Sequence, residues 1–351
     1  MVALLRHGMS GSALQILEVL ANLPRGENSR EFTASETRLI GKLEGAEHFG
    51  PNDLLRYILA ELWTSIVKTV LSALKLKKSA NPPRVWWCPI GPFTSLPIHA
   101  AGIYGEPHGD CVSDYVISSY TPTLAALLDP PTQTATPFKM TAIIQPETAG
   151  CSPLLYTKVE LTKIEERVPN QWLTSLGRNE QATVATALFY LQKSSIVHFA
   201  CHGTQDVMNP LDSGVLLTDG RLKVSQIIRR PEESPDDSQR KYMSLAFLSA
   251  CETAKGDDEL PDEAMHLAAT LLFAGFRGVV ATMWTIADPD GPKIADTFYQ
   301  HLFRNCDVAS DLHVLPDLTD AARALHLAVA KLREDPNVDF TRWVPFVHYG
   351  L

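Results

Sequence analysis

The sequence predicts an α/β fold: a mostly parallel sheet with helices on both faces, preceded by an α-helical N-terminal segment. Uninterrupted apolar runs at residues 196–200 and 245–248 are typical of strands that are buried on both faces. From residue 84 onward, strand-like runs alternate with helical patterns, which is the arrangement that a parallel sheet with crossover helices requires. A long amphipathic pattern at residues 53–76 comes before this alternation.

The N-terminal segment is expected to be helical. Apolar residues recur every three or four positions over 53–76, which predicts one helix with Asn52 or Asp53 as its cap. We expect its apolar stripe to pack either on the α/β domain or on helices of a longer chain. Asn81-Pro82-Pro83 marks a boundary, so the predicted division is an α-helical segment at 1–80 and an α/β domain at 82–351. A short helix is also expected near residues 14–20.

The first half of the α/β domain alternates regularly. Its predicted strands cover residues 84–89, 115–120, 139–144 and 172–176, and its predicted helices cover 123–128, 159–168 and 180–192.

The second half begins with a hairpin. Asp219-Gly220 separates strand-like residues 214–218 from 222–224, a typical hairpin turn. A charged, proline-interrupted loop at 229–241 precedes the run at 245–248. The helix expected at 262–275 is apolar nearly all round, which predicts deep burial. A strand at 279–283 and helices at 292–303 and about 319–333 complete the pattern.

Composition excludes several classes of protein. Hydrophobic residues make up 45% of the 351 residues and charged residues 20%, enough for a sizeable core. The formal net charge of -9 argues against nucleic-acid binding. Six scattered cysteines favour a reducing compartment over a disulfide framework. No apolar stretch reads as a signal peptide or a membrane span, so we expect a soluble, cytoplasmic protein.

The two apolar strands each end near a reactive side chain. His202 follows the first strand, and Cys251 follows the second. Ligands of open α/β sheets bind in the crevice beyond the carboxyl ends of the strands, so these side chains are expected to meet there. The pair predicts a Cys-His active site. The alternative for Cys251 is a buried, inert cysteine at a strand end.

The residues around this pair resemble the CHAT domain, a branch of the caspase-like, separase-related cysteine proteases. The resemblance rests on His198 to Gly203 (HFACHG), on Leu248 to Thr253 (LSACET), and on the 49 positions (251 minus 202) between histidine and cysteine. The caspase pentapeptide around the nucleophile is absent. The resemblance covers roughly residues 82–351 and extends more weakly to Gly91–Pro97, Tyr120–Leu124 and Trp343–Phe346.

The resemblance implies a caspase-like fold and a cysteine endopeptidase. Cys251 would be the nucleophile, His202 the proton carrier, and the backbone N–H groups of Gly203 and Cys251 the oxyanion hole. Glu252, if it faces the site, would raise the pKa of the cysteine. His198 and Cys201 are expected to be structural residues of the strand.

Substrate specificity is expected to come from an acid near the site. Relatives similar to separase place such an acid a few residues after a tryptophan, and Trp284 followed by Asp288 matches this placement. An aspartate before Pro289 is equally typical of a helix start, and one residue could serve both roles. Asp212 is the second candidate. The pattern favours cleavage after Arg or Lys over cleavage after an acidic residue.

No cofactor and no metal site is expected, because the sequence lacks zinc-ligand spacing, a complete calcium loop and a phosphate-binding glycine loop. The expected partners are a protein or peptide substrate and a helical-repeat or regulatory region, with neither nucleic acid nor membrane. The alternative function is a catalytically silent signalling or adaptor module of the same fold, and a third is acyl transfer to a small molecule.

Overall fold

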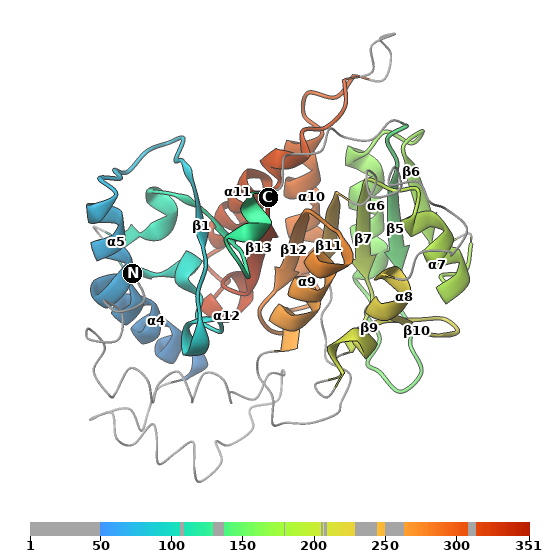
Figure 1. Cartoon of the computed structure of the whole chain (residues 1–351), viewed down its shortest axis with the longest axis horizontal. Helices are drawn as coiled ribbons and strands as arrows, with labels where there is room; N and C mark the ends of the chain where they lie inside the picture. The colour runs from blue at the N-terminus through green and yellow to red at the C-terminus, as the bar shows by residue number, and fades with distance from the viewer. Residues whose placement is uncertain are drawn as a thin grey trace.

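The fold is built around a central sheet of eight strands (Figure 1). The computed structural model describes residues 50–105, 109–128, 137–178, 180–204, 206, 209–228, 244–249, 263–307 and 314–351. The short helix predicted near residues 14–20, the charged loop at 229–241 and Cys251 lie outside these described residues. The strand order is β1 (Arg84–Trp87), β4 (Ile117–Tyr120), β13 (Phe346–Gly350), β12 (Gly278–Thr282), β11 (Leu245–Leu248), β7 (Ile196–Ala200), β5 (Met140–Ile144) and β6 (Leu173–Leu176).

The sheet consists of two parallel blocks. Strands β12, β11, β7, β5 and β6 run in one direction, and β1, β4 and β13 run in the other. The blocks join where β12 and β13 pair antiparallel, with Gly278 opposite Gly350. Two small sheets lie outside it: β8 (Gly203–Thr204), β9 (Gly214–Leu217) and β10 (Gly220–Lys223) form one, and β2 (Gly102–Ile103) pairs with β3 (Asp110–Cys111) in the other.

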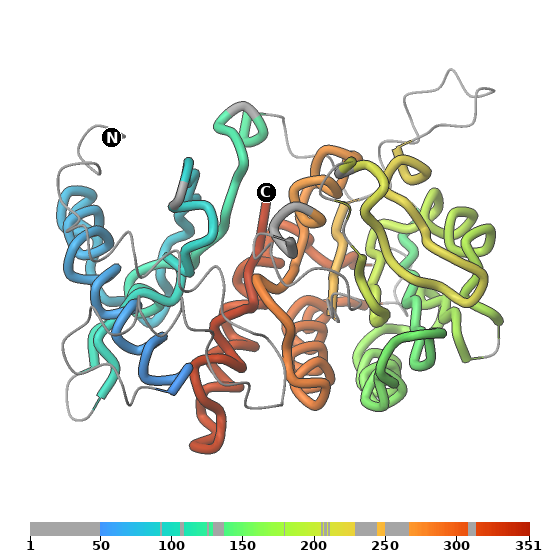
Figure 2. Tube along the Cα trace, turned by 90° about the horizontal axis from the view of Figure 1, so that it is seen from below, coloured from blue at the N-terminus to red at the C-terminus, as the bar shows by residue number. Residues whose placement is uncertain are grey.

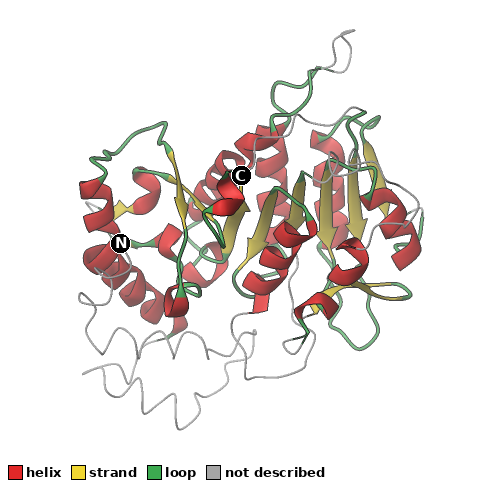
Figure 3. Cartoon of the chain, in the orientation of Figure 1, coloured by secondary structure: helices red, strands yellow, loops and turns green. Residues whose placement is uncertain are grey.

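Helices cover both faces of the sheet (Figure 3). One face carries α7 (Val184–Leu191), α8 (Val224–Ile228) and α9 (Glu263–Ala274), and the other carries α6 (Thr157–Arg167), α10 (Asp290–Leu302) and α11 (Ala321–Arg333). The short helix α12 (Phe340–Trp343) precedes β13. Single 3-10 turns lie at Gly91–Phe93, Ile98–Ala100, Val112–Asp114, Ala125–Leu127, Pro210–Asp212 and Leu318–Asp320. The predicted fold class, a mostly parallel sheet with helices on both faces, is confirmed.

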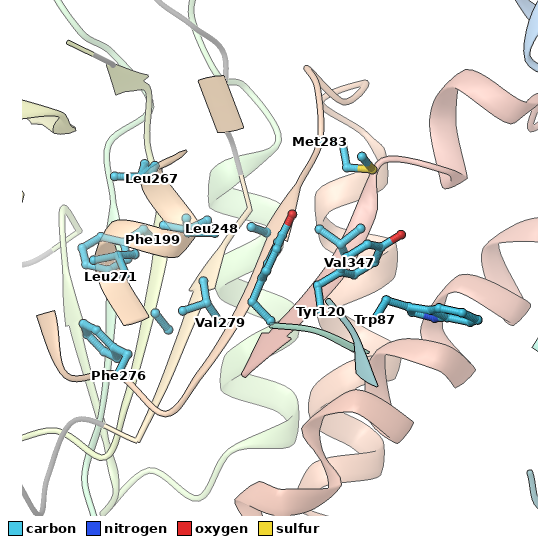
Figure 4. Close-up of a cluster of buried hydrophobic side chains, with 14 of the residues drawn as sticks. Trp87, Tyr120, Phe199, Leu248, Leu267, Leu271, Phe276, Val279, Met283 and Val347 are labelled. Atoms are coloured by element: carbon cyan, nitrogen blue, oxygen red, sulfur yellow. The ribbon is translucent and has the colours of Figure 1, made fainter. Parts of the chain in front are cut away.

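Each face of the sheet has its own hydrophobic core. Alternation along a strand directs successive side chains to opposite faces, so Phe199 and Leu248 join the α9 side, whereas Ala200 and Phe247 join the α10 side. Figure 4 shows Phe199 and Leu248 close to Leu267 and Leu271 of α9. Phe199 lies three residues before His202, and Leu248 lies three residues before Cys251. Packing against α9 therefore fixes β7 and β11 close to the point where each strand ends.

The N-terminal helix packs on the α/β domain, the first of the two expected arrangements. It runs as α4 (Pro51–Leu62), a π-helical turn (Trp63–Val67) and α5 (Lys68–Ala73). Leu54 and Ile58 join the core of one face and Leu59 that of the other, so this helix closes one end of the molecule (Figures 1 and 2). The division of the chain at residue 81 remains a prediction.

Three local predictions differ from the structure. Asn52 and Asp53 do not cap the helix, because it begins at Pro51 with Gly50 as its N-cap, and Asn52 Oδ1 instead accepts the N–H of Phe340 at 2.9 Å. The helix expected at 123–128 is only a 3-10 turn. Helix α9 is buried on one side alone: Leu271 is 2% exposed but Phe273 is 77% exposed, since composition does not reveal which side faces the sheet.

Strand β13 was not predicted at all, although it occupies the middle of the sheet. Across the ranges that the structure describes, no helix is both long and apolar enough to cross a bilayer.

Candidate active site

The carboxyl ends of β7 and β11 lie side by side, because the two strands are parallel neighbours inside the sheet. The two strands are parallel neighbours with Leu248 opposite Phe199, and the pairing continues one residue further, where the N–H of Ser249 donates to the carbonyl of Phe199 at 2.9 Å. Both strands therefore end at the same level of the sheet. His202 follows two residues beyond β7. Cys251 is two residues beyond Ser249 and lies outside the described residues, as does Glu252.

The His202 imidazole is buried and oriented by a backbone carbonyl. Its side chain is 1% exposed, and Nε2 lies 2.8 Å from the carbonyl oxygen of Ser152. A carbonyl only accepts hydrogen bonds, so Nε2 carries a proton and donates it. In the neutral ring the basic lone pair is then on Nδ1, which is the nitrogen able to take up a further proton. The backbone is also fixed, because the carbonyl of His202 accepts the N–H of Leu216 at 2.8 Å.

Gly203 and Asp212 lie in the small sheet that follows His202. Gly203 opens β8 and pairs with Val215 of β9. Asp212 ends a 3-10 turn, and its Oδ1 lies 2.9 Å from the Nζ of Lys223. The hydrogen bond from Lys223 lowers the pKa of Asp212. Asp212 is thus already paired with a cation of this chain.

Asp288 lies on the loop after β12, near His202. Its Oδ2 accepts the N–H of Tyr156 at 3.0 Å, in the segment that leads into α6. Burial raises the pKa of Asp288; the Tyr156 N–H lowers it, the Glu160 carboxylate raises it and His202 lowers it. Glu160 and His202 therefore act on the Asp288 carboxylate in opposite directions.

Asp288 does not start the helix that follows it. Helix α10 begins at Asp290 with Pro289 as its N-cap, and no side chain caps it. The prediction of a capping role in α10 was wrong, because the carboxylate instead turns toward the N-terminus of α6. The half-buried Trp284 anchors the same loop: its Nε1 donates to the carbonyl of Thr341 at 2.9 Å, and its ring packs against the core.

His198 and Cys201 are packed inside the domain. Cys201 is 1% exposed within the core of the α9 face, and His198 is fully buried on the other face. The ring of His198 stacks on Phe247 with centroids 4.8 Å apart, and its Nδ1 lies 3.0 Å from the hydroxyl of Tyr299.

Sequence reasoning missed two contributors to this site. Ser152 acts through its backbone carbonyl, so its side chain carries no signal. Glu160 lies in the first turn of α6, is only 2% exposed and accepts a hydrogen bond from the Ser249 hydroxyl. A glutamate in an amphipathic helix usually faces solvent, so the sequence gives no direct signal for Glu160. The only indirect signal is that its partner, Ser249, belongs to the LSACET run.

The arrangement places a buried imidazole, oriented by a backbone carbonyl, beside the strand that leads to Cys251. A carboxylate lies close by. Nucleophilic acyl transfer needs such a base next to a nucleophile. Within the described ranges, no group of three His, Cys, Asp or Glu side chains is placed to hold a metal ion.

Comparison with protein families gives a match over most of the chain. The model of the CHAT domain matches residues 56–351, so the matched region begins inside α4 rather than at residue 82. A search of curated proteins finds no match.

Comparison with solved structures gives matches at low identity. The Arg-specific cysteine proteinase gingipain R (RGPB) is 10% identical over 72% of this chain and 58% of its own, with a TM-score of 0.45. The Saccharomyces cerevisiae separase–securin complex is 15% identical over 100% of this chain and 23% of its own, with a TM-score of 0.48. A complex of Porphyromonas gingivalis RgpB pro- and mature domains is 10% identical over 97% of this chain and 75% of its own, with a TM-score of 0.49. The chain thus spans less than two thirds of the first two.

Proposed function

Since the chain belongs to the CHAT domain family, we propose that it is a cysteine endopeptidase with Cys251 as nucleophile and His202 as proton carrier. One observation carries the proposal: the buried His202 imidazole is held by the Ser152 carbonyl at the sheet edge where β11, the strand that leads to Cys251, also ends.

In the acylation step, Nδ1 of His202 takes the proton of the Cys251 thiol, and the sulfur attacks the carbonyl carbon of the scissile peptide. A C–S bond forms, and the carbonyl oxygen takes the negative charge, which the N–H groups of Gly203 and Cys251 stabilise. The C–N bond then breaks, and the departing amine takes a proton from Nδ1 of His202. In the deacylation step, Nδ1 takes a proton from water as the water oxygen attacks the thioester carbonyl carbon. The C–S bond then breaks, the carboxylic acid product leaves, and Nδ1 returns the proton to the sulfur of Cys251.

The Ser152 carbonyl supports both protonation states of His202. It accepts the Nε2 proton in the neutral ring and in the imidazolium, so the ring does not rotate when Nδ1 gains a proton. A carbonyl dipole aimed at the ring also stabilises the positive charge that forms during the reaction. The proton therefore moves at one nitrogen only, on the side away from Ser152.

The substrate is proposed to carry Arg or Lys at the cleaved position, with Asp288 as its partner. Asp288 supports this assignment because it is half-buried and its hydrogen-bond partners, the backbone N–H groups of Tyr156 and Leu155, are neutral. Asp212 is a weaker choice, since Lys223 already neutralises it. Trp284 then contributes by anchoring the loop that bears Asp288.

The dyad is tested with single variants and a panel of peptide amides. Cys251→Ala and His202→Ala are each expected to lower kcat/KM for Arg- and Lys-ended substrates at least 10³-fold, because nucleophile and base act as one unit. Cys88→Ala, which removes a half-buried cysteine directly after β1, is the control and is expected to leave activity unchanged. Full activity in either dyad variant would refute the assignment.

The alternative, a silent adaptor module, predicts a different result with thiol reagents. In an active enzyme, iodoacetamide labels Cys251 much faster than the other cysteines, because a neighbouring imidazole favours the thiolate. In an adaptor, labelling of all six is slow and similar, and no peptide amide is cleaved. Peptide mapping by mass spectrometry distinguishes the two.

A further inference from the structure

The segment that enters α6, residues 152–160, contacts three parts of the candidate site. The Ser152 carbonyl accepts from His202 Nε2 at 2.8 Å, and the Tyr156 N–H donates to Asp288 at 3.0 Å. Four residues later, the Glu160 carboxylate accepts from the hydroxyl of Ser249. We call residues 152–160 the α6 entry segment. It is one continuous piece of chain that touches the base, the proposed specificity acid and the strand that leads to Cys251.

Glu160 is the buried centre of a polar cluster. Its side chain and those of His198, Ser249 and Tyr299 are each at most 2% exposed. His198 Nε2 lies 3.2 Å from Glu160 Oε1, close enough for electrostatic attraction although it is not aligned as a hydrogen bond. His198 Nδ1 contacts the Tyr299 hydroxyl at 3.0 Å. The cluster thus joins α6, β7 and α10 to the residue that directly follows β11.

Burying a carboxylate costs free energy unless hydrogen bonds or charges compensate it, so a buried Glu160 indicates a specific role. Ser249 supplies one. It is the last described residue before Cys251, and it is fixed twice: its N–H by Phe199 of β7 and its hydroxyl by Glu160 of α6. These two bonds fix the position of Ser249 directly after β11.

We propose that Glu160 and Ser249 are positioning residues: through the α6 entry segment they fix the chain two residues before Cys251 relative to His202. This inference rests on the proposed function, in which Cys251 is the nucleophile. Because His202 and Ser249, which is two residues before Cys251, are both bonded to the same nine residues, their separation does not depend on longer paths through the sheet. A displacement of about 1 Å between reacting groups lowers catalysis about 100-fold, which makes such a shared reference useful.

Gly291 shows how closely this pair is packed. A Cβ at this position of α10 would lie 2.9 Å from Ser249 Oγ and 3.0 Å from Glu160 Oε2. Contacts this short force one group to move. Gly291→Ala should therefore disturb the same bond from outside, without removing either partner.

The first experiment compares Ser249→Ala with Ser194→Ala. Ser194 is the matched control: it is equally buried, and its hydroxyl bonds Thr141 at 2.7 Å and the Tyr190 carbonyl at 2.8 Å, but it precedes β7 at the opposite edge of the sheet. Ser249→Ala is expected to lower kcat 10- to 100-fold with KM changed less than threefold. Ser194→Ala is expected to lower the melting temperature similarly and to leave kcat within twofold. Equal kcat values for the two variants would overturn the proposal.

Glu160 is tested by rescue. Glu160→Ala should lower kcat as much as Ser249→Ala, whereas Glu160→Gln keeps an oxygen that accepts the Ser249 hydroxyl and should retain at least a third of wild-type kcat. A purely structural role predicts that activity follows melting temperature in both variants. Gly291→Ala should lower kcat in the wild type and have less effect in Ser249→Ala, where Oγ is gone. Additive effects of these two changes would count against the shared bond.

Alkylation of Cys251 separates this inference from the proposed function. The rate of iodoacetamide labelling at one neutral pH, followed by mass spectrometry, is expected to fall at least threefold in Ser249→Ala and Glu160→Ala and to stay constant in Ser194→Ala. If the wild type cleaves no peptide, the protease proposal fails, yet these rates still decide the positioning role. Unchanged labelling in both variants would refute positioning whatever the activity of the wild type.

Discussion

The carboxyl group of Asp288 lies between opposing influences. Burial raises its pKa, the Tyr156 N–H lowers it, the Glu160 carboxylate raises it and His202 lowers it. The acid therefore gains a proton at a higher pH than an exposed aspartate does. A cationic substrate side chain binds only the ionised form, so substrate affinity should fall as the pH drops through this raised pKa.

Asp288→Asn tests this relation. KM for an Arg-ended peptide is expected to rise 10- to 100-fold, because the amide keeps the shape but loses the charge. In the wild type, KM for the same peptide should increase on acidification, and in the variant this dependence should disappear. Steady-state kinetics at several pH values give both quantities. Asp212→Asn is the control. An equal rise in KM in this variant would contradict the assignment of specificity to Asp288.

Residue types predicted part of the site, and contacts between distant segments supplied the rest. His202 and Asp288 carry side chains whose chemistry is visible in the sequence. Ser152 could not be predicted, because any residue has a carbonyl. Glu160 could not be predicted either, because its helix also carries the half-buried Glu165 and the exposed Glu166, and spacing alone does not distinguish the three.

At the scale of elements, a buried ion pair joins the start of α10 to α12. Asp290 is fully buried, and its two oxygens accept from Arg342 at 2.8 Å and 2.5 Å. This two-point contact fixes the loop that carries Asp288 against the chain that leads into β13. The loop is thus held from its helical end as well as by Trp284.

Arg342→Ala is expected to lower the free energy of unfolding by about 3 kcal/mol, because it leaves a buried carboxylate without its main partner. Chemical denaturation measures this loss. Adding Asp290→Asn to the variant removes the charge and should recover part of the stability. A change below about 0.5 kcal/mol in Arg342→Ala would show that Lys293, 3.9 Å from Asp290, suffices as a partner.

At the scale of the whole molecule, the two parallel blocks depend on the join between β12 and β13. Gly350 is essential to it: its φ is 85°, and a Cβ there would lie 2.1 Å from the carbonyl oxygen of Arg277. Only glycine avoids this backbone contact. The blocks are thus expected to unfold together when this join fails.

Gly350→Ala is expected to cost at least 2 kcal/mol more than Gly150→Ala. Gly150 has a φ of 82°, so the backbone penalty of about 1 kcal/mol is shared, but no atom lies within 4 Å of its added Cβ. Thermal unfolding of both variants provides the comparison. Equal costs would mean that the Arg277 carbonyl moves aside without penalty.

The sequence predicted the class of fold more fully than its topology. Alternating strands and helices predicted the block that contains β5, β6, β7, β11 and β12, because apolar runs and helical spacing are local signals. Strand β13 escaped prediction, since five residues after a proline look like a tail. Its place between β4 and β12 depends on contacts far apart along the chain, which no local pattern records.

The position of β13 between β4 and β12 also constrains how the chain folds during synthesis. Residues 84–120 and 196–282 leave the ribosome before residues 346–350, which must enter between them. Until then, β4 and β12 each present an unpaired edge, and such edges readily pair with other chains. A nascent chain that stalls before residue 346 is therefore expected to aggregate rather than to persist as two folded halves.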